Sequence, residues 1–150
     1  MRMSRKIEFR GKRIDNGKWV YGDYFKTPLT DENSGTKSEA GWFFLTGELR
    51  HCIGQDNVAF TVDEKTVGQF TGLRDKNGKK IFEADIVKID DREIGAKDII
   101  IGEVYWCADY TLWKAGPGFC VWSKKGHSDL SPNIEIIGNI YENPELLGEK

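Results

Sequence analysis

The sequence predicts a mainly β protein, a compact multi-stranded antiparallel sheet or barrel with one short helical turn near the C-terminus. Apolar and polar residues alternate with the period of two that marks β-strands, and turn residues interrupt this pattern at short intervals. No window shows a convincing helical period. Because 39% of the 150 residues are hydrophobic and 12% are aromatic, the composition fits a folded soluble domain.

Two β-hairpins are the clearest local predictions. In the first, Ile7 and Phe9 alternate with charged residues, and Asn16-Gly17 then precedes a second strand-like run over 19–25. Asn-Gly tolerates the positive φ angles of tight hairpin turns. The same dipeptide recurs at Asn77-Gly78, between two further strand-like runs, so we expect a second hairpin there.

Further strands are expected along the rest of the chain, at residues 41–46, 57–62, 85–90, 98–107, 118–123 and 133–141. Glycines inside these patterns indicate bulges or bends, at Gly72, Gly102 and Gly138. Residues 31–41 are polar and are predicted as an exposed loop. A single helical turn is expected at 144–147, where Asn143 and Pro144 precede it and Gly148 ends it.

The strand pattern runs through the whole chain, so residues 1–150 are predicted as a single domain. Within it we expect an N-terminal hairpin unit at about 5–30 and a larger sheet at about 41–142. No stretch is apolar enough to span a bilayer, and no secretory signal is recognisable. The three cysteines show no spacing typical of a disulfide framework, so we expect reduced thiols in a cytoplasmic protein.

Known catalytic and metal-binding patterns are missing from the sequence. There is no nucleophile elbow and no phosphate-binding loop, and His51-Cys52 is the only closely spaced pair among the histidines and cysteines. The sequence therefore predicts no cofactor, no metal site and no enzyme of a common type. Metal-dependent hydrolysis at an acidic loop is kept as a third hypothesis, although a charged hairpin loop explains its residues equally well: Asp85, Asp90, Asp91 and Glu93.

Three segments, residues 9–24, 67–89 and 134–147, together resemble the YopX family, which is found mainly in phages and prophages. The middle block, TGLxDxxGxxIxxxDIV, is the most specific of the three. The resemblance implies a β-rich protein without an established enzymatic activity. Ala84 stands where the family pattern commonly has glycine, which predicts a backbone without positive φ at this position. Residues 86–89 and 102–106 also resemble the start of an SH3-like barrel.

Basic and aromatic residues around the two hairpins form the candidate binding surface. These are Arg10, Lys12, Arg13 and Trp19 at the first hairpin, and Arg74, Lys79 and Lys80 at the second. Cations neutralise phosphates and aromatic rings stack on bases, so hairpins sharing one face would suit a nucleic acid. Alternatively, such lysines keep hairpins soluble and protect sheet edges. Trp113, in a turn-rich segment, is predicted to be the exposed tryptophan that marks a protein interface.

The leading hypothesis is a non-enzymatic phage or prophage accessory protein that binds a host or phage protein through its β surface and exposed aromatic residues. The alternative is a nucleic-acid-binding module that uses the basic hairpins. Because small β domains often pair their edges with a copy of themselves, we also expect a homo-oligomer. No membrane partner is expected, because the net charge is only −2.

Overall fold

The computed structural model describes residues 6–30, 45–90, 99–109, 112–116, 119–120 and 133–148. In this part of the chain the strands form open antiparallel sheets and not a closed barrel, which confirms the predicted mainly β class. The chain divides into two compact units. We call Met1–Ile7 with Gly68–Lys150 unit 1, and Glu8–Val67 unit 2. That the whole chain is a single domain stays a prediction.

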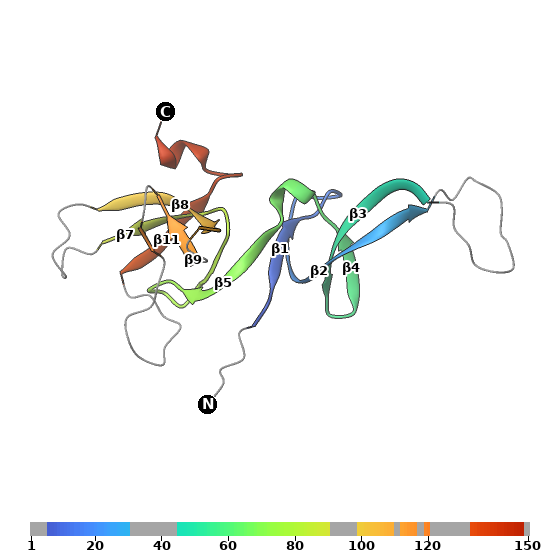
Figure 1. Cartoon of the computed structure of the whole chain (residues 1–150), viewed down its shortest axis with the longest axis horizontal. Coiled ribbons are helices and arrows are strands. Elements are labelled where there is room, and N and C mark those ends of the chain that lie inside the picture. Colours follow the sequence, from blue (N-terminus) through green and yellow to red (C-terminus); the bar gives the residue numbers. More distant parts are fainter. Residues whose placement is uncertain are drawn as a thin grey trace, which may run out of the picture. The chain divides into compact units, whose positions relative to one another are not determined.

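Unit 2 is an antiparallel meander in the order β4-β3-β2-β1, followed by a 3-10 turn (Figure 1). Its elements are β1 (Phe9–Lys12), β2 (Trp19–Thr30), β3 (Leu45–Gln55), β4 (Val58–Thr61) and η1 (Glu64–Thr66). Three side chains, Val20, Ile53 and Val62, form its buried core. Half-buried hydrophobic residues surround this core: Phe9, Tyr24, Phe60 and Val67.

Unit 1 begins with a hairpin and continues into a five-stranded sheet in the order β10-β9-β8-β7-β11. Its elements are β5 (Gly68–Arg74), β6 (Lys80–Phe82), β7 (Asp85–Ile89), β8 (Ile100–Cys107), β9 (Leu112–Ala115), β10 (Phe119–Cys120), β11 (Ile134–Asn139) and η3 (Pro144–Leu147). A larger core lies here, formed by Ile81, Val87, Ile89, Val104, Trp113, Ala115 and Ile134.

Both predicted hairpins are confirmed. β1 pairs with β2 and β5 pairs with β6, in each case antiparallel. The turn glycines, Gly17 and Gly78, have φ of 67° and 79°, which are the left-handed values that made glycine necessary there. The expected C-terminal turn is also present as η3, and Gly148 follows it with φ of 76°.

Asp75, in the middle block, organises the second hairpin. Its side chain is buried, and its Oδ1 accepts the amide N–H of Asn77 and of Lys79 at 2.9 Å each. Its Oδ2 accepts the amide N–H of Ile136, on β11, at 3.2 Å. Three amide donors that would otherwise need partners are therefore satisfied by one carboxylate.

The prediction for Ala84 is wrong. Its φ is +67°, so the backbone does adopt the conformation that glycine accommodates. Two hydrogen bonds hold it there: its amide N–H donates to the Val104 carbonyl oxygen at 2.8 Å, and its own carbonyl oxygen accepts from the Ile140 amide at 3.0 Å. The buried methyl group is thus tolerated at a strained position because the surrounding backbone fixes it.

The three glycines within the strands serve different structural purposes. The ladder shifts register between Phe70 and Arg74, around Gly72, and again between Ile136 and Gly138, which confirms bulges at these two sites. Gly102 instead keeps an uninterrupted register with β7. A Cβ atom at Gly102 would lie 2.3 Å from the backbone nitrogen of Gly116, so a close approach of two backbones requires this glycine.

Other predicted elements are confirmed in part. β4, β7, β8 and β11 lie within the ranges expected for them. β3 extends well beyond the predicted strand at 41–46, of which residues 41–44 lie outside the described residues, as does the predicted loop at 31–41. No helix in the described ranges is long and apolar enough to cross a membrane.

Candidate functional site

The basic residues of the first hairpin pack against its aromatic ring. Register places Lys12 opposite Trp19, and Arg10 lies on the same face of β1 as Lys12. The Arg10 guanidinium is 4.6 Å from the centre of the Trp19 ring, and the Lys12 ammonium is 5.5 Å from it. Arg10 is only 6% exposed. These cations therefore cover an aromatic residue by cation–π contact, and Arg10 is not a surface group.

Arg13 is also engaged within the protein. Its Nε donates to Asp15 Oδ1 at 2.8 Å, and its Nη2 pairs with the other carboxylate oxygen. This hydrogen-bonded pair holds the pKa of Asp15 below its usual value. The guanidinium also stacks 4.4 Å from the centre of the Phe60 ring. A phosphate would have to compete with a two-point carboxylate pair for this arginine.

The second hairpin uses its cations in a similar way. Arg74 Nη1 donates to the carbonyl oxygen of Gly78 in the turn at 2.9 Å, and Lys80 Nζ lies 5.7 Å from the centre of the Phe70 ring. Lys76 forms an ion pair with Glu135, and Lys79 is exposed. The two basic hairpins belong to different units, unit 2 and unit 1. Much of the predicted basic surface thus has a structural role.

Trp113 is not the exposed tryptophan that the sequence predicted. It is 6% exposed and belongs to the core of unit 1. Trp113 lies within β9, where it shares the buried face of the strand with Ala115. Its cross-strand partner Trp106 is 41% exposed, and the two rings meet edge to face at 5.2 Å. Trp106, and not Trp113 as predicted, is therefore the exposed member of this pair of tryptophans.

Exposed apolar side chains gather along β8. Ile101 and Tyr105 project from one face, with exposed fractions of 46% and 36%, and Trp106 projects from the other. We call the two residues that share a face, Ile101 and Tyr105, the β8 surface. Glu103 lies between Ile101 and Tyr105 on the same face of β8. Register places Lys88 opposite Ile101 and Lys114 opposite Tyr105, and Glu135 lies opposite Lys88 on the next strand. Exposed aliphatic and aromatic side chains among charges of both signs suit a protein partner better than a polyanion.

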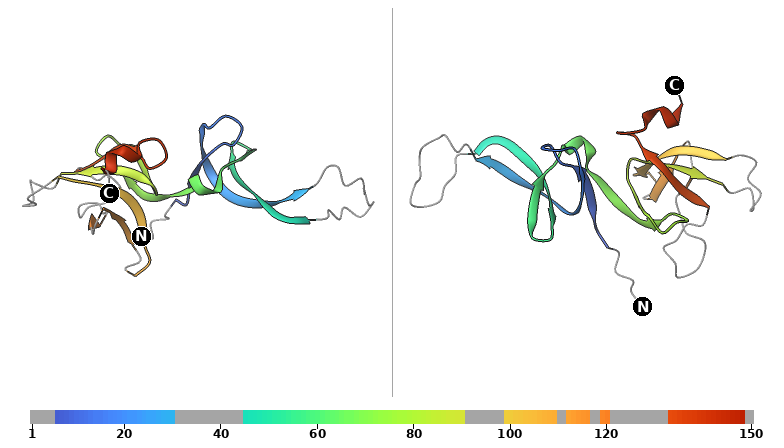
Figure 2. Two further views of the ribbon diagram at one scale, coloured as in Figure 1. Left: turned by 90° about the horizontal axis from the view of Figure 1, so that it is seen from above. Right: turned by 180° about the vertical axis from the view of Figure 1, so that it is seen from behind.

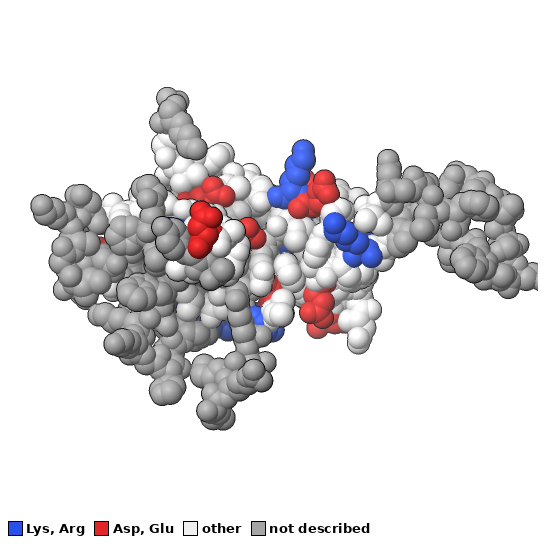
Figure 3. All heavy atoms as spheres, in the orientation of Figure 1, with Lys and Arg blue, Asp and Glu red and all other residues white. Residues whose placement is uncertain are grey.

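The charge distribution elsewhere agrees with this balance. On the face drawn in Figure 3, acidic and basic side chains are interspersed among uncharged atoms, and neither sign forms a continuous area over the described residues. A nucleic-acid surface would show an excess of lysine and arginine along one groove.

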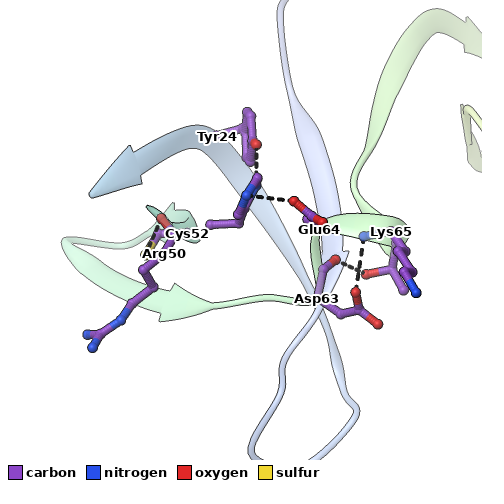
Figure 4. A network of polar contacts seen from close by, with 8 residues as sticks. Tyr24, Arg50, Cys52, Asp63, Glu64 and Lys65 are labelled. Carbon is purple, nitrogen blue, oxygen red and sulfur yellow. Dashed lines mark hydrogen bonds and ion pairs between the residues drawn. The ribbon is translucent and has the colours of Figure 1, made fainter. Parts of the chain in front are cut away.

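A polar network joins three elements of unit 2 (Figure 4). The Tyr24 hydroxyl and His51 Nδ1 are 2.6 Å apart, and His51 Nε2 lies 2.8 Å from a carboxylate oxygen of Glu64. With the ring proton on Nε2, the imidazole donates to Glu64 and accepts from the phenol. The network connects β2, β3 and η1. It was not predicted because its residues are far apart in the sequence, and only β-strand register brings two of them together.

The acidic residues proposed for hydrolysis do not form a site in the described part of the chain. Asp85 is buried, and its Oδ2 accepts the amide N–H of Phe82 at 2.8 Å, which fixes the turn between β6 and β7. The Asp90 amide donates to the Asn133 carbonyl oxygen. Asp91 and Glu93 lie outside the described residues. No cluster of three or more potential metal ligands occurs among the described residues.

Comparison with known families identifies this fold. The YopX protein family model matches residues 8–148. The chain belongs to the YopX family. This YopX chain is also similar to the crystal structure of protein EF1440 from Enterococcus faecalis, at 25% sequence identity and a TM-score of 0.50, covering 96% of this chain and 99% of that one. No curated protein matches it. The likeness thus extends over nearly the whole chain and concerns its architecture.

Proposed function

We propose that this YopX protein is a non-enzymatic accessory protein of a phage or prophage that binds a host or phage protein in the host cytoplasm. The observation that carries the proposal is the β8 surface, where Ile101 and Tyr105 are exposed on one face of the sheet. Tyrosine and tryptophan supply much of the binding energy at protein interfaces. The balanced charges around Ile101 and Tyr105 favour a protein over a polyanion.

The nucleic-acid alternative receives less support. Its residues Arg10 and Arg13 are occupied with Trp19, Asp15 and Phe60, and these contacts would have to break before either arginine could meet a phosphate. Homo-oligomer formation stays a prediction of its own.

The test is quantitative cross-linking in cells that express the protein, with the variants Ile101→Glu and Tyr105→Glu. A carboxylate in the centre of the β8 surface should abolish the cross-linked partner, because an unpaired charge would be buried at the interface. Lys79→Glu, an exposed charge change in the same unit, is the matched control and should leave the partner unchanged. A partner that survives both β8 variants would refute the proposed surface.

Fluorescence anisotropy with single- and double-stranded DNA and RNA separates the two hypotheses. We expect no binding at low or physiological salt. Binding that falls steeply with salt would favour the nucleic-acid alternative, since phosphate contacts release counterions.

A further inference from the structure

The two longest strands of unit 2 extend beyond their neighbours. β2 has 12 residues and β3 has 11, whereas β1 and β4 have 4 each. β1 pairs with β2 only as far as Gly22, and β4 pairs with β3 only as far as Cys52. The remainder, residues 23–30 of β2 and 45–51 of β3, forms a two-stranded ribbon that we call the arm (Figures 1 and 2).

The β2 edge of the arm has no described strand beside it. Over residues 23–30, β2 pairs with β3 on one side, and no described strand pairs with its other side. Alternate residues of such an edge direct their N–H and C=O groups outward, where they can pair with an added strand. Pro28 lacks an N–H group, so the stretch that can form an uninterrupted ladder is 23–27.

Side chains give this edge a chemical preference. Phe25, 39% exposed, and Lys26 are consecutive, so they project to opposite faces of the ribbon. Arg50 is exposed on β3 and lies opposite Thr27, on the face of Phe25. Neither Lys26 nor Arg50 has a side-chain ion pair or hydrogen bond within the described residues. Lys26 and Arg50 thus place a cation on each face of the arm, Phe25 adds an exposed aromatic ring, and the arm also contains two acids, Asp23 and Glu48.

We propose that residues 23–27 of β2 accept an extended segment of a partner protein as an added strand. This mode of recognition takes affinity from backbone hydrogen bonds and specificity from alternate side chains. Side chains of the added segment would lie beside Phe25 on one face and beside Lys26 on the other. The segment that fits therefore alternates apolar with acidic residues.

A second copy of this chain fits the edge less well. A pairing of two β2 edges that places the two Lys26 residues side by side would be opposed by their like charges. The acidic side chains of a partner strand would instead be attracted to Lys26. Lysine and proline on an edge strand are common protections against self-association, and here they leave 23–27 open to a partner of complementary charge.

The probes are three fluorescent ten-residue peptides: one alternates valine and glutamate, one alternates valine and lysine, and one repeats the first with a central proline. We expect the acidic peptide to bind at least about fivefold more tightly than the lysine peptide, the size of effect an exposed ion pair gives. The proline peptide should not bind, because a proline interrupts the ladder. Amide exchange of residues 23–27 should slow only with the acidic peptide.

Two charge variants test the assignment to Lys26. Lys26→Glu should reverse the preference, so that the lysine peptide binds more tightly. Lys18→Glu makes the same change at an exposed turn position of the same unit and should leave the preference intact. Equal effects of the two variants, or no protection of 23–27 at millimolar acidic peptide, would overturn the proposal. So would protection that grows with protein concentration alone, which would assign the edge to a second copy.

This surface is independent of the β8 surface, so the two can fail separately. Tyr105→Glu should abolish the cross-linked partner of unit 1 without changing peptide binding at the arm. A loss of peptide binding in Tyr105→Glu would contradict the assignment to β2.

Discussion

The two units of this protein stabilise their small β cores in different ways. Among the described residues, the core cluster of unit 1 contains seven buried hydrophobic residues, whereas that of unit 2 contains three, surrounded by half-buried aromatic and aliphatic side chains. In unit 2 the aromatic rings Trp19 and Phe60 are covered by cations. Where there is little hydrophobic area to bury, long basic side chains supply the cover by placing their guanidinium groups over aromatic rings. Cations that suggest a binding surface can therefore be part of the packing.

The largest expected difference between the units is the cost of an equivalent cavity. Ile81 in unit 1 and Ile53 in unit 2 are both fully buried. We expect Ile81→Ala to cost about 4 kcal/mol of unfolding free energy and Ile53→Ala about 2.5 kcal/mol, because the half-buried neighbours of Ile53 can relax into the space. Denaturant unfolding with amide exchange of each unit measures both. Equal costs would mean that the smaller core is packed as rigidly as the larger.

The next prediction tests how closely the backbones of unit 2 pack. A Cβ atom at Gly22 would lie 1.9 Å from the carbonyl oxygen of Gly54, so Gly22→Ala should cost more than about 2 kcal/mol. Gly54→Ala is the matched control across the same strand pair, since its Cβ would meet Phe25 only at 3.4 Å. Thermal melting of both variants should show a large shift for the first alone.

In unit 1 the buried carboxylate of Asp75 connects the β5–β6 hairpin to β11 by hydrogen bonds. Asp75→Ala should destabilise the protein by about 2 kcal/mol, because the backbone N–H groups of Asn77, Lys79 and Ile136 lose the carboxylate oxygens that accept them. Exchange of the Lys79 and Ile136 amides should accelerate together. Asp56→Ala, at an exposed turn, is the control. Faster exchange at only one of the two amides would show that Asp75 does not couple the hairpin to β11.

The smallest expected effect is an increase in the free energy of unfolding, where the other variants decrease it. Ala84→Gly relieves a left-handed conformation that costs about 1–2 kcal/mol and gives up a buried methyl group worth about 0.8 kcal/mol. The net result should be a gain of up to about 1 kcal/mol in unit 1. Ala115→Gly removes an equally buried methyl from a strand and should destabilise. A loss of stability in Ala84→Gly would mean that the methyl contact outweighs the strain.

Local features of the fold could be predicted from the sequence because short-range chemistry determines them. Asn16-Gly17, Asn77-Gly78 and the Pro144 turn need only their neighbours, and all three are present. β3 was largely missed because residues 47–55 carry glycine, charge and histidine without alternation, and the pairing with β2 stabilises the strand.

The candidate site was harder to predict because exposure depends on register. Trp113 lies next to a glycine-rich turn, yet pairing with β8 carries it into the core and leaves Trp106 exposed. Arg10 looked like a solvent-facing cation on an alternating strand, but Trp19 of the next strand covers it. Both outcomes depend on cross-strand neighbours, which a single strand's pattern does not contain.

The position of β11 has a consequence for the order of folding during synthesis. Unit 2 is one continuous stretch and has all its strands once Val67 has left the ribosome. Unit 1 needs a strand from near the end of the chain: β11 pairs with β7, and the Asp75–Ile136 hydrogen bond spans 61 residues. Until β11 emerges, the nascent chain carries β7 with one side open, and this is the interval in which wrong strand pairing threatens it most.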